Sequence, residues 1–152
     1  MMVEEKLYYA IGHIALDELV FFLREQAQDS FPSLRDENYL ETLAEKWSQN
    51  AKFCVCRKSD NTPVGMIAFY ANQLETGTAY IPHVYVRPEF RNHGLFSSMF
   101  NLVSQYVKDH GFTNIRLEVA KENERARRAY LKSGFREESH ASKESVYLTK
   151  SL

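Results

Sequence analysis

The amino-acid sequence predicts an α/β layer fold that is built on one mixed β-sheet. Helical and strand-like hydrophobic periodicities alternate along the chain, and this alternation is typical of α/β domains. Phe135 and the stretch 146–149 add two closing strands at the end of the chain. With 152 residues the chain has the size of one domain, so we expect a single domain over residues 1–152.

The first half of the chain predicts a strand, two helices and a hairpin. Strands are expected at residues 6–11, 52–57 and 64–72. Helices are expected at residues 17–28 and from Asp36 onward, where apolar residues recur at helical spacing. Phe31–Pro32–Ser33 separates the two helices, and turn-forming residues at 59–63 join the hairpin strands. The second helix should bury one stripe of residues: Tyr39, Leu40, Leu43 and Trp47.

The second half predicts two further units of strand and helix. Strands are expected at residues 78–86 and 114–120, and helices at residues 91–110 and 123–133. Gly111 and Gly134 stand where these helices should end. Because Pro82 has no N–H to donate, the strand 78–86 must be an edge, bulged or splayed at that point. The long helix should turn one stripe to the core: Leu95, Met99, Leu102, Val103, Tyr106 and Val107.

Charge and hydropathy exclude several classes of partner. The chain has 19 Lys and Arg against 20 Asp and Glu, and this balance argues against a dedicated nucleic-acid binder. The longest apolar stretch, residues 64–71, is far too short to cross a bilayer. The first residues lack the basic-then-apolar pattern of a signal peptide. We therefore expect a soluble, cytoplasmic protein without a membrane or nucleic-acid partner.

The two cysteines predict no metal site. Cys54 and Cys56 are separated by one residue on an expected strand, so their side chains point to the same face. Two further ligands at the spacing of a zinc site are missing. We expect both to be small core residues in a reducing compartment.

The segment from Val84 to Phe96 carries the first sign of function. It passes from a strand through a turn into a helix, and the first backbone N–H groups of a helix have no partners within it. Such N–H groups, with Gly94 allowing close approach and Arg91 adding a cation, suit a phosphate group. A capped surface helix with a charged residue would give the same pattern.

A second segment strengthens this interpretation. Together, the two segments resemble the GNAT acetyltransferase superfamily over residues 78–136. Arg91 and Gly94 match its phosphate-binding motif. Its second motif is matched by Asn123, Ala126, Tyr130, Gly134 and Phe135. Either motif by itself is weak, but both occur in order, separated by one helix and one strand.

The resemblance implies a largely antiparallel sheet with helices on both faces, in which two central strands splay apart to form a cleft for acetyl-CoA. The strand residues that would pair with the pantetheine arm are Val84, Tyr85 and Val86. The amides that would cradle the pyrophosphate belong to Arg91, Asn92, His93, Gly94, Leu95, Phe96 and Ser97. From the second motif, the residues near the cofactor would be Asn123, Ala126 and Tyr130. Asn123 is also a natural helix N-cap.

Phe96 departs from the family pattern, because the corresponding position usually holds Gly or Ala. Its side chain either crowds the pyrophosphate or turns into the core beside Met99 and Phe100. A separate basic run offers cations to the phosphates, although a solvated helix face explains it as well. This run consists of Arg125, Arg127, Arg128, Lys132 and Arg136.

The chemistry expected of this cleft is attack of an amine on the thioester carbonyl. By resemblance, the N–H of Val84 stabilises the developing oxyanion and Tyr130 serves the departing thiolate. The base is open between Tyr80, His83, Glu118 and a relayed water. Strand alternation puts His83 on the face opposite Tyr80 unless a bulge resets it.

We therefore predict an N-acetyltransferase that uses acetyl-CoA, without a metal, on a primary amine. A small-molecule acceptor, such as an amino sugar or its nucleotide conjugate, is favoured by compactness and neutral charge. The alternatives are a protein N-acetyltransferase and a non-catalytic acyl-CoA-binding module. The sequence leaves open whether the protein is a monomer or a homodimer. By family analogy the acceptor wall would draw on the aromatic first half, most of which we expect in the core: Phe21, Phe22, Phe31, Tyr39 and Trp47.

Overall fold

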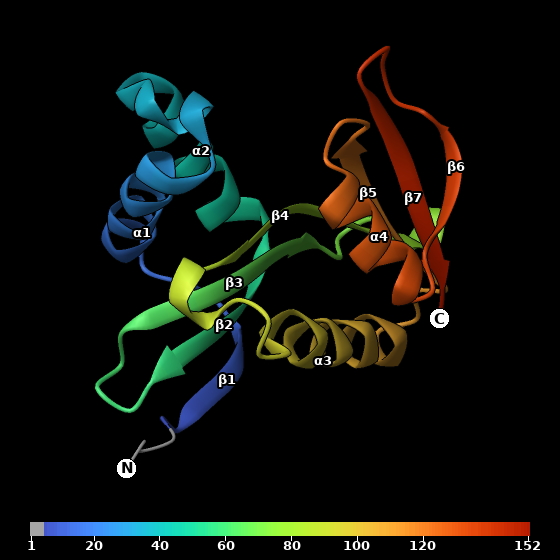
Figure 1. Ribbon diagram of the computed structural model, residues 1–152. Coiled ribbons are helices and arrows are strands. Elements are labelled where there is room, and N and C mark those ends of the chain that lie inside the picture. The colour runs from blue at the N-terminus through green and yellow to red at the C-terminus, as the bar shows by residue number, and fades with distance from the viewer. Residues whose placement is uncertain (1–4) are drawn as a thin grey trace.

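The computed structural model describes residues 5–152 and contains a seven-stranded β-sheet (Figure 1). Its strands are β1 (Leu7–Gly12), β2 (Lys52–Lys58), β3 (Pro63–Tyr70), β4 (Thr78–Val86), β5 (Asn114–Ala120), β6 (Arg136–His140) and β7 (Ser145–Ser151). The order across the sheet is β1-β2-β3-β4-β5-β7-β6. All neighbours are antiparallel except β4 and β5, which are parallel. The predicted mixed, largely antiparallel sheet is confirmed.

Helices cover both faces of the sheet, as expected (Figure 1). Within residues 5–152 the α-helices are α1 (Leu16–Asp29), α2 (Glu37–Asn50), α3 (Leu95–Asp109) and α4 (Glu124–Lys132). Short 3-10 turns are η1 (Pro32–Arg35), η2 (Leu74–Thr76) and η3 (Pro88–Phe90). One hydrophobic core joins the sheet to α3 and α4, and a second core joins it to α1 and α2. The sheet therefore separates two buried layers.

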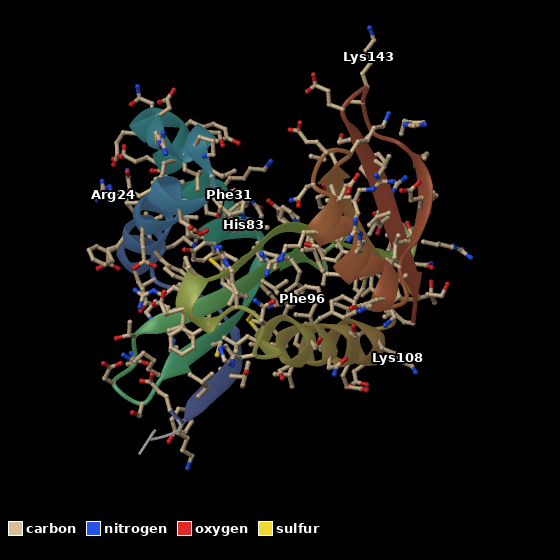
Figure 2. All side chains as sticks on the ribbon, viewed as in Figure 1. Arg24, Phe31, His83, Phe96, Lys108 and Lys143 are labelled. Carbon is tan, nitrogen blue, oxygen red and sulfur yellow. The ribbon has the colours of Figure 1, made fainter. Side chains whose placement is uncertain are left out.

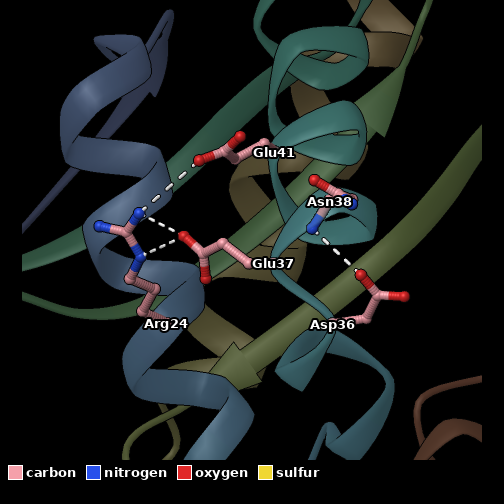
Figure 3. A network of polar contacts seen from close by, with 5 residues as sticks. All are labelled: Arg24, Asp36, Glu37, Asn38 and Glu41. Atoms are coloured by element: carbon pink, nitrogen blue, oxygen red, sulfur yellow. Dashed lines mark hydrogen bonds and ion pairs between the residues drawn. The ribbon is translucent and has the colours of Figure 1, made fainter.

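The α1–α2 pair is fixed by a cap and by ion pairs at its surface (Figure 3). Asp36 caps α2, because its side chain accepts hydrogen bonds from the N–H groups of Asn38 and Tyr39. Arg24 of α1 pairs with Glu37 at the start of α2 and lies 3.8 Å from Glu41. These surface contacts add to the apolar packing of α1 against α2 in the second core.

The predicted elements agree with the observed ones with one informative exception. The long helix begins at Leu95 rather than at Arg91, because Asn92 (φ 66°) and Gly94 (φ 79°) adopt left-handed conformations that a helix cannot contain. The prediction that Tyr39 and Leu102 lie in the core is wrong, because Tyr39 is 47% exposed and Leu102 is 41% exposed. Other apolar positions fill the core instead, including Phe100 on α3.

Both cysteines lie in the core, as the sequence predicted. Cys54 and Cys56 are both buried and free, and both belong to the core on the α3 side of the sheet. Burial raises the pKa of the Cys54 thiol to about 12, so this thiol remains protonated and chemically inert. Both cysteines act as small apolar side chains.

The pairing of β4 with β5 ends halfway along β4. The register runs from Thr78 opposite Asn114 to Ile81 opposite Leu117, and the next residue of β4 is Pro82. Within residues 5–152, the remainder of β4 pairs only with β3 on its other side. This β4–β5 fork is the splay that the resemblance implied, and Pro82, which has no N–H, stands at its apex.

A bulge in β4 accompanies the fork. Against β3, the step from Tyr80 to His83 spans three residues of β4 but only two residues of β3, from Tyr70 to Ala68. The extra residue reverses the alternation of faces. Ile81 therefore packs in the α3-side core, whereas His83 and Tyr85 face α1 and α2. The bulge that could reset His83 is present, and it places His83 on the same face as Tyr80.

Candidate active site

The β4–β5 fork opens a cleft with a volume of about 320 Å³. Its walls are the separated ends of β4 and β5, with Pro82 and Glu118 on opposite sides. Phe31 from the α1–α2 connection and the first turns of α4 complete it. The predicted site residues that border the cleft are His83, Val84, Asn123, Ala126 and Tyr130.

A second cavity of about 360 Å³ lies at the start of α3. Both cavities border α4, the cleft through Ala126 and Tyr130 and the second cavity through Ala129 and Lys132. They therefore follow one another along one helix. The predicted residues that border the second cavity are Val86, Arg91, Asn92, Gly94, Leu95, Phe96 and Ser97.

The first turn of α3 presents a row of N–H groups that have no partner within the helix. The first hydrogen bond of the helix runs from the N–H of Ser98 to the carbonyl of Gly94, at 3.0 Å, so the preceding N–H groups at Leu95–Ser97 start the helix without that bond. The left-handed residues Asn92 and Gly94 bend the chain in front of them. A Cβ built on Gly94 would meet nothing within 4 Å, and Gly94, Leu95 and Ser97 all border the second cavity. Unpaired N–H groups at a helix N-terminus suit an anion.

Arg91 is engaged by protein groups on its own side of the loop. Its Nε donates to the carbonyl of Val86 at 2.9 Å, and its guanidinium pairs with Asp29 of α1. Partial burial by itself would raise the pKa of Asp29, but hydrogen bonds from Arg91 and Ser30 lower it overall. In this arrangement Arg91 ties the loop to β4 and α1, while its charge is shared with Asp29.

Phe96 packs inward while still bordering the second cavity. Its ring stacks on Phe100 with centroids 5.6 Å apart and meets Tyr130 edge-on at 5.4 Å. The half-buried ring thus belongs to the aromatic contacts between α3 and α4 (Figure 2).

Tyr130 is held between aromatic rings. Its ring lies edge-on to Phe96 at 5.4 Å and to Phe135 at 5.7 Å. Burial raises the pKa of its hydroxyl to about 12, so the hydroxyl stays protonated at any physiological pH. Full transfer of its proton to a thiolate, whose conjugate acid has a pKa near 8.5, would cost about 5 kcal/mol. Tyr130 is therefore suited to donate a hydrogen bond rather than to release its proton.

Asn123 and its neighbours fix the start of α4. The side chain of Asn123 accepts a hydrogen bond from the N–H of Ala126 at 3.2 Å, which makes it the N-cap of α4. Arg125 donates to the Asn92 side chain at 3.0 Å and so links α4 to the loop before α3. The capping role expected of Asn123 is confirmed, and Asn123 also borders the cleft.

His83 is a buried, neutral imidazole at the edge of the cleft. The centroid of its ring lies 4.5 Å from that of Phe31 and 5.0 Å from that of Trp47. Figure 2 labels His83 and Phe31 at this edge. Its Nε2 is 2.5 Å from Oε1 of Gln26, whose amide nitrogen donates to Met66 at 3.4 Å. Because the Gln26 oxygen must accept, Nε2 of His83 carries the proton and Nδ1 keeps a lone pair. Burial lowers the pKa of His83 to about 4.

Gln26 is a site residue that the sequence analysis missed. It is fully buried on the apolar stripe of α1, with Leu19, Phe22 and Leu23. A glutamine at a core position of an amphipathic helix needs a buried hydrogen-bond partner. This polar residue on an apolar stripe could have identified Gln26 from the sequence.

Two of the three side chains proposed as bases border the cleft, and the third does not. His83 and the exposed carboxylate of Glu118 border the cleft. Tyr80 borders a neighbouring cavity instead, and burial together with the charge of Glu118 raises its pKa. Tyr85 and His93, predicted near the cofactor, border neither the cleft nor the second cavity. The Tyr85 ring is buried against Phe22 of α1.

The comparison with protein families decides the affiliation of this chain. Residues 19–135 match the model described as the acetyltransferase (GNAT) family. The chain belongs to the GNAT acetyltransferase family. The resemblance inferred from the Arg91 and Asn123 motifs is confirmed, and so is its identification as an enzyme of the acetyltransferase class. A search of the curated proteins finds no match.

Solved structures share the GNAT fold at low sequence identity. The PaiA N-acetyltransferase from Thermoplasma acidophilum, solved with coenzyme A, is 19% identical with a TM-score of 0.74, covering 95% of this chain and 99% of its own. A GNAT-family protein from Desulfovibrio desulfuricans is 16% identical with a TM-score of 0.79, covering 96% and 99%. A spermidine N-acetyltransferase mutant from Vibrio cholerae is 18% identical with a TM-score of 0.69, covering 94% and 93%.

Two further findings concern the part of this GNAT chain that the structure describes. Across residues 5–152, His, Cys, Asp and Glu side chains form no group of three or more that could hold a metal ion. In the same residues, no helix is long and apolar enough to cross a membrane.

The environment of His83 predicts a pH-dependent stability. The unfolded chain binds a proton with a pKa near 6.5 and the folded chain with a pKa of about 4, so acidification through this range favours unfolding. We expect His83 to lower the free energy of unfolding by about 2 kcal/mol between pH 7 and pH 5. Urea denaturation at both pH values measures this difference, which His83→Gln should remove.

The matched control is His93→Gln, which changes an exposed histidine and should keep the wild-type difference. If the wild type and His83→Gln lost the same free energy on acidification, the assignment of a buried neutral His83 would be wrong.

Proposed function

We propose that this protein is an N-acetyltransferase that uses acetyl-CoA to acetylate a primary amine of a small molecule. The observation that carries the proposal is the alignment of two unfilled sets of backbone groups along α4. One set is the open edge of β4 at the fork, and the other is the N–H row in the first turn of α3.

The residues present fit the shape and charge of a coenzyme A molecule. The N–H groups at Leu95–Ser97, with Lys132 on the far wall of the same cavity, suit a pyrophosphate. The open edge of β4 suits the amides of an extended pantetheine arm, which would lie where a further strand would pair. The thioester end would then reach the cleft beside Tyr130.

The register of β4 supports a particular role for Val84. The N–H of Arg87 donates to Val64 of β3, whereas the carbonyl of Val86 accepts from Arg91 on the other side. Because N–H and C=O groups alternate in direction along a strand, Val84 and Val86 point away from β3 and Tyr85 points toward it. We assign the N–H of Val84 to the carbonyl oxygen of the thioester, where it would stabilise developing negative charge.

The remaining roles follow from the environment of each side chain. Acetyl-CoA supplies an activated acetyl group. Glu118, as the exposed carboxylate of the cleft, attracts the ammonium form of the acceptor and receives its proton through water. A free amine near pKa 10.4 is neutral in only about one molecule in 2,500 at pH 7, so this deprotonation matters. Tyr130 donates a hydrogen bond to the departing sulfur.

The cofactor part of the proposal predicts a ligand-induced stabilisation. Acetyl-CoA at 100 times its Kd should add about 2.7 kcal/mol to the free energy of unfolding and raise the Tm. Gly94→Asp should abolish this shift, because it places a negative charge over the N–H row. Gly94→Asn has nearly the same size and tolerates the positive φ, so it should keep most of the shift.

Differential scanning fluorimetry with both variants tests this directly. Absence of a Tm shift in the wild type at millimolar acetyl-CoA would overturn the proposal. An undiminished shift in Gly94→Asp would show that the loop binds no phosphate.

The assignment of Tyr130 predicts a selective effect on turnover. Tyr130→Phe keeps the ring between Phe96 and Phe135 and removes only the hydroxyl. We expect kcat and kcat/KM to fall by about 10²-fold, with acetyl-CoA affinity within a few-fold of the wild type. Because the pKa of Tyr130 is about 12, the rate profile between pH 6 and pH 10 should keep its shape.

Steady-state kinetics on the best amine of a panel, together with cofactor titration, measures these quantities. An unchanged kcat would remove Tyr130 from the mechanism. Weakened cofactor binding with a normal kcat would make it a binding residue.

A further inference from the structure

A polar cavity of about 510 Å³ lies on the sheet next to the fork. It is separate from the cleft and from the cavity at the start of α3, and the roles assigned above leave it without a function. Strands β4, β5, β6 and β7 supply its floor. The residues that matter for its chemistry are Thr78, Tyr80, Asn114, Arg116, Arg136 and Glu138.

The sheet register explains why these side chains share a face. Tyr80 is paired with Arg116 across the β4–β5 pair, Arg116 with Thr149 across β5 and β7, and Thr149 with Arg136 across β7 and β6. Directly paired residues point to the same face. The alternate residues, such as Ile115 and Leu148, are buried in the core on the α3 side. The polar face therefore lies on the side of the sheet away from α3 and α4.

The cavity carries an excess of positive charge. Arg116 is held in place, since it donates to Glu138 at 2.9 Å and lies over the Tyr147 ring at 4.0 Å. Thr149 also donates to Glu138, at 2.7 Å. Arg136 is exposed, and no ion pair within residues 5–152 engages it. Two guanidinium groups thus face one carboxylate, surrounded by hydroxyl and amide side chains.

The strand spacing gives the distance between the arginines of this cavity and the carboxylate of Glu118 at the fork. Tyr80 and Arg116 form the last pair but one before the strands separate, and Glu118 follows on the same face of β5. Two residues along a strand span roughly 7 Å. Arg116 therefore lies one such step from the cleft carboxylate, and Arg136 lies two strands further across the sheet, roughly 10 Å from Arg116. The carboxylate and the two arginines form a bipolar surface with its negative end at the cleft.

We propose that the acceptor is an amine that carries an anionic group, a carboxylate or a phosphate, roughly 7–10 Å from the reacting nitrogen. This inference rests on the proposed function. Glu118 attracts the amine end, while Arg116 and Arg136 bind the anion, for which the planar guanidinium offers paired donors. A polyamine would bring a second cation against the two arginines and would be disfavoured.

Amines of matched length test the proposal. The probes are 6-aminohexanoate, 5-aminopentyl phosphate, hexylamine and 1,6-diaminohexane, each assayed for release of the CoA thiol. We expect kcat/KM for at least one anionic amine to exceed that for hexylamine by roughly tenfold or more, and the diamine to be the poorest. The two anionic probes distinguish a carboxylate from a phosphate as the preferred group.

Variants of the exposed Arg136 give the decisive comparison. Arg136→Gln should lower kcat/KM for the preferred anionic amine about tenfold, through KM, and leave hexylamine within twofold. Arg136→Glu should invert the preference in favour of the diamine. The matched control is Lys108→Gln, which removes an exposed cation in the last turn of α3 and should leave all four amines unchanged.

Each outcome bears on a stated claim. Acetylation of all four amines at similar rates, or an equal effect of Arg136→Gln on hexylamine and on the anionic amines, would overturn the inference and leave the proposed function standing. Acetylation of none of them, together with the absence of a Tm shift with acetyl-CoA, would overturn the proposed function and this assignment with it.

Discussion

The structure depends on one constraint, the end of pairing between β4 and β5 after Ile81 and Leu117. Pro82 cannot donate to a neighbouring strand, and the bulge beside it turns the following residues over. From this point β4 remains bonded to β3 but has an open edge toward β5. The end of pairing opens the cleft and leaves the Val84 and Val86 backbone groups without a partner strand among the described residues. The bulge places His83 toward α1 and α2.

The fork is accessible from both faces of the sheet, and the two faces carry different candidate binding groups. On the side of α3 and α4, the N–H row at Leu95–Ser97 and the aromatic contacts of Tyr130 surround the path that we propose for the cofactor. On the opposite side, Arg116 and Glu118 extend from the fork across the open sheet. The proposed donor and acceptor would therefore meet from opposite faces where the strands separate, without crossing a continuous sheet.

Much of this arrangement could be predicted from the sequence, because the informative features are local. Periodicity located the strands and helices, Pro82 indicated the fork, and two short motifs indicated the family. What could not be predicted depends on contacts between distant segments. The pairing of Arg91 with Asp29 and the bond from His83 to Gln26 join β4 and its following loop to α1. The start of α3 at Leu95 is a local effect that the hydrophobic pattern does not reveal, because it is set by the left-handed backbone of Asn92 and Gly94.

The most direct measurement is amide hydrogen exchange by NMR at Val84 and Tyr85, with and without coenzyme A. If the edge of β4 is open at the fork, the Val84 amide of the free protein should exchange at least about tenfold faster than the Tyr85 amide, which points toward β3. Saturating coenzyme A should remove most of this difference by pairing with Val84. Equally slow exchange at both amides of the free protein, or a difference that coenzyme A leaves unchanged, would contradict the account.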